Sequence, residues 1–134
     1  MNTLNEVMAP HGVEIPEHLV ADAEVPVLSG LQRQGDVIVV PMRAGKVTGL
    51  KVIPLDGVPV VRGESGGNTH LLVGGGRWAS KTTDPAVMGT LVVDDPAAPA
   101  YLIHPEHGAT GIGPGSYVIA RQREQADVVR LVSD

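Results

Sequence analysis

Short runs of valine, isoleucine and leucine, each bounded by glycine, proline or aspartate, follow one another from Gln34 to the end of the chain. Seventeen glycines and eleven prolines among 134 residues provide many turns. β-branched side chains fit the half-buried surface of a pleated strand, whereas in a helix they lose rotational freedom. The pattern therefore predicts an all-β fold, a single compact barrel or sandwich of short, mostly antiparallel strands.

We expect eight or nine strands in this β domain. The expected strands span residues 36–42, 50–53, 58–61, 70–73, 77–80, 90–93, 101–103, 116–123 and 128–132. The first run is continuous enough to be buried on both faces. Because Pro59 cannot donate a ladder hydrogen bond, the third strand is expected to lie at a sheet edge or to begin late. Gly74–Gly76 separates two short strands, and we expect it to form a flexible hairpin tip.

The first thirty residues differ from the rest of the chain. Residues 3–8 can form a short helix with Asn2 or Thr3 as the N-cap, and residues 15–22 can form a second one. Neither helix is long enough to be stable alone. We therefore expect residues 1–30 to be a partly helical arm and residues 31–134 to be the β domain. The apolar side chains of the arm need a surface, which we expect to belong at least partly to another subunit.

Charge and composition exclude several classes of protein. The net charge is −5 and the ten basic residues are scattered, which argues against a nucleic-acid partner. No apolar run is long enough for a membrane span, and Met1–Val20 lacks the features of an export signal. The chain has no cysteine, which excludes disulfides and thiolate ligands. We assign no catalytic residue, because no nucleophile motif is present and a carboxylate–imidazole pair is commonly structural.

Three histidines fall in two short polar stretches of the chain. One stretch is His104-Pro105-Glu106-His107, and the other runs from Glu64 to His70. Imidazoles bind Zn, Fe or Mn, and Glu64 and Glu106 could hold the second nitrogen of each ligating ring. A metal would require the three rings to converge. In the alternative that we favour, the rings are well separated, each bonds loop backbone at a strand end, and no metal is bound.

Three further residues are candidates for an interface. Arg121 and Arg123 share a strand face with Tyr117, and they could clamp a carboxylate of the same chain or of a partner. Trp78, the lone tryptophan, is expected either to fill the core or to anchor another subunit.

Three motifs occur in order along the chain. They are Gln34–Pro41, the stretch from Arg62-Gly63-Glu64 to His70, and the stretch from His104 through Pro114-Gly115-x-Tyr117 to Arg121-Gln122-Arg123-Glu124. Together they resemble a family of small uncharacterised β-domain proteins from high-GC bacteria and their phages. Members of that family often have a histidine at the position of Asn68, so this chain lacks one potential ligand.

A β domain with an N-terminal arm, glycine-rich turns and no strong catalytic set favours a non-enzymatic structural or interaction module. Together with the phage association of the resemblance, this suggests a capsid decoration or head-stabilising protein of a phage virion. Such a protein is expected in the virion or the cytoplasm, as a homo-oligomer or part of a larger assembly, without a cofactor. The alternative is a metal-binding, cupin-like β-barrel that uses His70, His104 and His107. A barrel for a small apolar ligand is a third possibility, which the shortage of aromatic residues disfavours.

Overall fold

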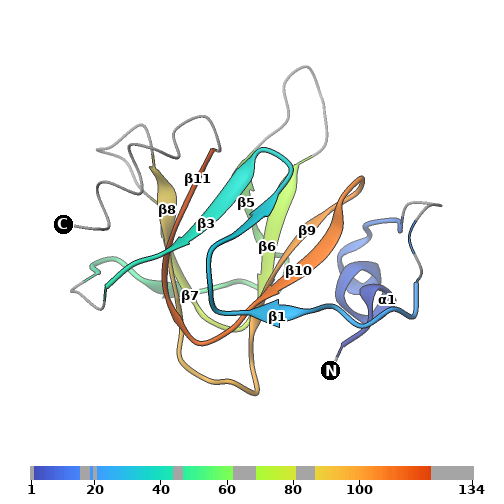
Figure 1. Ribbon diagram of the computed structural model, residues 1–134, viewed down its shortest axis with the longest axis horizontal. Coiled ribbons are helices and arrows are strands. Elements are labelled where there is room, and N and C mark those ends of the chain that lie inside the picture. The colour runs from blue at the N-terminus through green and yellow to red at the C-terminus, as the bar shows by residue number, and fades with distance from the viewer. Residues whose placement is uncertain are drawn as a thin grey trace.

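The computed structural model describes residues 2–15, 19, 21–43, 47–61, 69–80 and 87–121, which form two packed β-sheets (Figure 1). The five-stranded sheet has the order β1 (Val27–Leu28), β10 (Gly108–Ile112), β9 (Ala100–His104), β6 (His70–Gly74), β5 (Val58–Val61). The six-stranded sheet has the order β2 (Gln32–Gln34), β3 (Val37–Pro41), β11 (Gly115–Arg121), β8 (Val87–Val93), β7 (Arg77–Ser80), β4 (Lys51–Val52). The predicted all-β fold is confirmed, and its two open sheets form a sandwich rather than a barrel.

The strand pairs are antiparallel except for one. β1 runs parallel to β10, and every other pair of named strands is antiparallel. β5 is an edge strand, as Pro59 predicted, and its register against β6 shifts between Pro59 and Val61. The expected strand at residues 128–132 and the end of the one at 116–123 lie outside the described residues.

The main core fills the space between the two sheets. It contains side chains from both, including Val39 and Ile119 of the six-stranded sheet and Leu72 and Leu102 of the five-stranded sheet. The run of valine and isoleucine in β3 is continuous because both faces of this strand are buried. Its odd-numbered residues Val37 and Val39 enter this core, whereas Ile38 and Val40 are buried on the opposite face with Val118. The prediction of a strand buried on both faces is confirmed.

The N-terminal arm packs on the outer face of the five-stranded sheet (Figure 1). Helix α1 (Leu4–Met8) begins with a capping box between Thr3 and Glu6 and continues into a 3₁₀ turn, η1 (Ala9–His11). Leu4, Val7 and Met8 are buried in a cluster that includes Tyr101 and Ile103 of β9. The chain itself therefore covers the apolar face of α1, which the sequence argument had assigned partly to another subunit. Half of the expected helix at residues 15–22 lies outside the described residues, and the described ones, Ile15, Leu19, Ala21 and Asp22, are not helical. No helix among the described residues is long and apolar enough to cross a membrane.

Gly74, at the end of β6, and the two glycines that follow it do not form a hairpin tip. β6 pairs with β5 and β9 in one sheet, whereas β7 pairs with β4 and β8 in the other. The glycines therefore carry the chain from one sheet to the other. Gly74 and Gly76 adopt φ angles of +92° and +99°, and a Cβ on Gly75 would overlap the carbonyl oxygen of Ala98. The hairpin prediction is wrong because β6 and β7 belong to different sheets. Glycines are needed here for the positive φ angles and for the close approach of the backbone to Ala98.

Candidate metal site

His70 and His104 are brought together by the pairing of β6 with β9. His70 begins β6 and His104 ends β9, and the antiparallel register Leu71↔Ile103 places the two histidines opposite each other. Since side chains alternate along a strand, both histidines lie on the same sheet face as the core residues Leu72 and Leu102. Each histidine is only 5% exposed. The pair therefore lies at the rim of the sandwich, where the core ends.

His107 joins this pair through the turn between β9 and β10. The turn is closed by the pairing of His104 with Gly108, which has a φ of +81°. The ring centroid of His107 lies 4.6 Å from that of His104 and 6.1 Å from that of His70, and the His70 and His104 centroids are 4.3 Å apart. The three rings form one cluster, with His104 in the middle. The expectation of well-separated rings is therefore wrong.

The turn between β2 and β3 covers the cluster from the other sheet. Gly35 has a φ of +56° in this two-residue turn. A Cβ on Gly35 would lie 2.7 Å from Nε2 of His107, so the His107 ring would have to shift to make room for any other residue type. The site is therefore built from both sheets, and the sequence analysis did not identify Gly35 as part of it. A glycine between Gln34 and Asp36 is a recognisable turn signal, but it does not reveal what lies beneath the turn.

Gln34 links the cluster to the neighbouring strands. Nε2 of His70 donates a hydrogen bond to the backbone carbonyl of Gln34 at 3.1 Å. The Gln34 side chain, in turn, donates to the Leu102 carbonyl at 2.9 Å and to Thr110 Oγ1 at 3.5 Å. Because Nε2 of His70 donates, the neutral ring carries its lone pair on Nδ1. Gln34 was not predicted to belong to the site, because a polar residue before a turn is ordinarily exposed.

His104 is also held by backbone. The N–H of Glu106 donates to Nδ1 of His104 at 3.0 Å. This bond orients the ring and, in the neutral form, leaves the proton on Nε2. His70 and His104 thus each have a backbone partner, as the structural alternative predicted, although the rings are clustered.

The environment keeps His70 uncharged at neutral pH. Burial, together with charge repulsion from the neighbouring imidazoles of His104 and His107, lowers the pKa of His70 from its ordinary value of 6.5 to about 4. The Gln34 carbonyl and the Asp36 carboxylate oppose this shift. A neutral imidazole is the form that binds metals.

His104, Glu106 and His107 form the donor set with the best geometry for a cation. Each offers one ligand atom, and these atoms lie within 4.8 Å of one another. In a tetrahedral site with bonds of about 2.1 Å, two ligand atoms lie about 3.4 Å apart, so a pair 4.8 Å apart must close by about 1.4 Å when the ion binds. His104 is buried, whereas Glu106 and His107 are exposed, so solvent reaches one side of the group.

The other predicted site residues have different environments. Glu64, Asn68 and Arg123 lie outside the described residues. Arg121 is half-buried at the end of β11. Trp78 is 7% exposed and belongs to the main core, which supports the first of its two predicted roles rather than an exposed anchor for a subunit.

Comparison with known proteins gives one match. A protein-family model described as a domain of unknown function (DUF8820) matches residues 33–122, a range that contains all three clustered histidines. No curated protein matches the chain. No solved structure matches it.

Proposed function

The chain belongs to the DUF8820 family of domains of unknown function, so its role must be inferred from its own chemistry, and we propose that it binds a divalent transition metal. The ligands are His104, Glu106 and His107. The ring of His70 packs against the ring of His104, with their centroids 4.3 Å apart. One observation supports this assignment most directly. Three ligand atoms of the right chemistry lie within 4.8 Å of one another, on a turn fixed by two paired strands.

The donor set favours particular metals. Two imidazoles and one carboxylate occur in catalytic zinc sites and in non-haem iron sites, and both leave coordination positions open. Calcium and magnesium prefer oxygen ligands alone. Zn²⁺ is therefore the first choice for a binding experiment, and Fe²⁺ and Mn²⁺ are the natural alternatives.

Metal binding has an identifiable local cost. Ligation through Nδ1 of His104 would replace the hydrogen bond from the Glu106 N–H. A hydrogen bond of this kind contributes about 1 kcal/mol, and the affinity that a titration measures is net of this cost.

Isothermal titration of the metal-free chain with Zn²⁺ tests the proposal. We expect one ion per chain with a dissociation constant below about 1 μM, and at least a tenfold weaker affinity in the His107→Ala variant. His11→Ala is the matched control, because His11 lies in η1 outside the cluster. Absence of saturable binding, or equal affinities in the two variants, contradicts a metal site.

A second proposal concerns protein partners. Val27, Leu28 and Leu31 are 37%, 49% and 56% exposed, and they follow one another along β1, the edge of the five-stranded sheet, and the loop after it. Exposed apolar residues beside an edge strand favour a protein–protein contact. This supports an interaction module, such as a virion decoration or head-stabilising protein.

Light scattering after size exclusion tests this second role. We expect an oligomer at micromolar concentration that dissociates in the Leu28→Asp variant. The Leu55→Asp variant is the control, because Leu55 is 95% exposed in the loop between β4 and β5. A monomer at every concentration contradicts the self-associating form of the proposal.

A further inference from the structure

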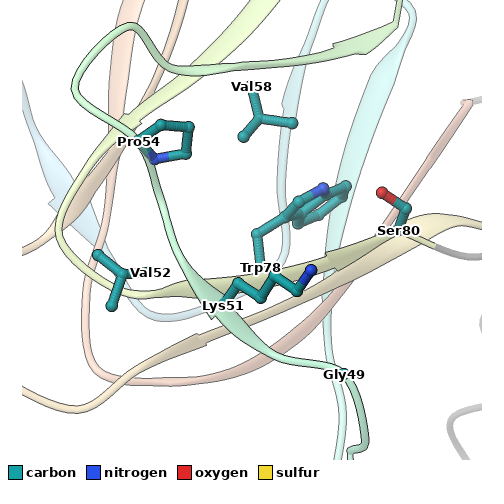
Figure 2. Close-up of a pocket in the computed structure, with 7 residues that line it drawn as sticks. All are labelled: Gly49, Lys51, Val52, Pro54, Val58, Trp78 and Ser80. Carbon is teal, nitrogen blue, oxygen red and sulfur yellow. The ribbon is translucent and has the colours of Figure 1, made fainter.

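A cleft opens between strands β4 and β5, which are edge strands of opposite sheets. Its volume is about 580 Å³, within the range of sites for small organic ligands. Figure 2 shows Pro54 and Val58 on one side of the space and Lys51, Trp78 and Ser80 on the other. None of these residues belongs to the histidine cluster.

The walls of the cleft are mainly apolar. Val58 packs against the main core, and the indole of Trp78 is part of that core. Gly89 on β8 makes room for the indole, because a Cβ at this position would overlap the ring. Val52 and Leu55 lie close by in sequence and are 76% and 95% exposed. An apolar molecule in the cleft would therefore contact the half-buried side chain of Val58, the buried side chain of Trp78 and also the exposed side chain of Val52.

Three polar side chains line the cleft, and each can donate a hydrogen bond: those of Lys51, Trp78 and Ser80. Lys51 is the cross-strand partner of Trp78, and Ser80 follows two residues later on the same strand face. Nε1 of Trp78 is buried and has no hydrogen-bond partner among the described residues. Lys51 likewise forms no ion pair within the described part of the chain. The buried Trp78 N–H and the Lys51 cation, both without acceptors among the residues that the structure describes, favour a ligand in the cleft that carries a negatively charged acceptor.

We propose that this cleft binds a small amphipathic carboxylate. Its carboxylate accepts a hydrogen bond from Trp78 Nε1 and pairs with the Lys51 ammonium, and its apolar body lies along Pro54 and Val58. Since Nε1 has almost no exposed surface, the indole must shift slightly as the carboxylate enters. The shortage of aromatic residues does not prevent such a site, because one indole and several aliphatic side chains form its walls. This site is independent of the proposed metal site.

Fluorescence of Trp78, the only tryptophan, reports directly on the cleft. We choose octanoate as the probe, with octanol and octylammonium as ligands of equal chain length. Octanoate should change the emission saturably with a dissociation constant at or below about 1 mM, octanol should bind at least tenfold more weakly, and octylammonium should not bind.

Variants at Lys51 separate charge pairing from apolar adsorption. Lys51→Met should weaken octanoate binding about tenfold, and Lys51→Arg should retain it. Arg77→Met is the matched control, because Arg77 is the neighbouring residue of Trp78 on the opposite strand face and pairs with Asp94. It should bind octanoate like the unchanged chain.

Three results would overturn the carboxylate site. They are no saturable change with octanoate up to about 5 mM, equal binding of octanol and octanoate, or unchanged affinity in Lys51→Met. The His107→Ala variant, which tests the metal site, should bind octanoate normally, so failure of one proposal is distinguishable from failure of the other.

Discussion

His70 faces His104 across the β6–β9 pair, with ring centroids 4.3 Å apart, although 33 residues separate them in the chain. Backbone pairing of two central strands fixes their separation, so the cluster does not depend on a long flexible loop. The hydrogen bonds to His70 and His104 then set how each ring is turned.

Replacing Gly35 should disturb both the turn and the site. The Gly35→Ala variant places a methyl group against His107 at a positive φ, so we expect a loss of about 1–3 kcal/mol in unfolding free energy and weaker Zn²⁺ binding. Gly12→Ala is the control, because Gly12 has a φ of +71° but nothing within 4 Å of its Cβ position. Urea unfolding of both variants measures the loss of unfolding free energy that each suffers from alanine at a positive φ. Zinc titration then shows whether only Gly35→Ala weakens metal binding. Equal zinc affinities would contradict a contact between this turn and the ligands.

Acid should destabilise the metal-free protein through His70. Its pKa is about 4 in the folded chain and about 6.5 when unfolded, so between these values the unfolded state binds more protons. The contribution of His70 to the unfolding free energy is complete well above pH 6.5 and declines as the pH falls towards 4, by on the order of 3 kcal/mol. The groups that act on His70 are His104, His107 and Asp36.

The His70→Gln variant isolates this effect. Glutamine can still donate to the Gln34 carbonyl but does not titrate. Urea unfolding of the metal-free proteins between pH 7 and pH 4 should show a smaller loss of stability in the variant. Parallel curves for the two proteins would rule out His70 as the source of the pH dependence.

The N-terminal arm should stabilise its own domain. Met8 is 0% exposed in the cluster between α1 and the five-stranded sheet, so Met8→Ala should lower the unfolding free energy by about 2–4 kcal/mol. Asn5→Ala, an exposed change in the same helix, should have little effect. The loss should not depend on protein concentration, because the covering surface belongs to the same chain. A loss that disappears on dilution would instead assign that surface to another subunit.

Local sequence patterns predicted those strands whose residues have a high intrinsic β propensity. β3 follows from its unbroken valine and isoleucine run, and the edge position of β5 follows from Pro59. β10 was not expected, because Gly108–Ile112 contains two glycines and little apolar surface. Its glycine at position 111 is needed because the Pro26 carbonyl would lie 2.9 Å from a Cβ there. Neighbouring strands, rather than intrinsic propensity, make this segment a strand.

The candidate site was predictable in its residues but not in its geometry. The sequence indicated His70, His104 and His107 as candidate ligands and Glu106 as a partner of a ligating ring, whereas the structure groups the ligand atoms of His104, Glu106 and His107. Their convergence depends on which strands pair and in which register, and no local pattern encodes that. Gly35 and Gln34 were missed for the same reason, because they reach the cluster from the other sheet.

X-ray absorption at the zinc edge of the Zn²⁺-loaded chain tests the metal site most directly. We predict nitrogen and oxygen ligands at about 2.0–2.1 Å, with the scattering pattern of two imidazoles, and loss of one imidazole in the His107→Ala variant. A shell of oxygen ligands alone, or a spectrum that His107→Ala leaves unchanged, would contradict a metal bound by His104, Glu106 and His107.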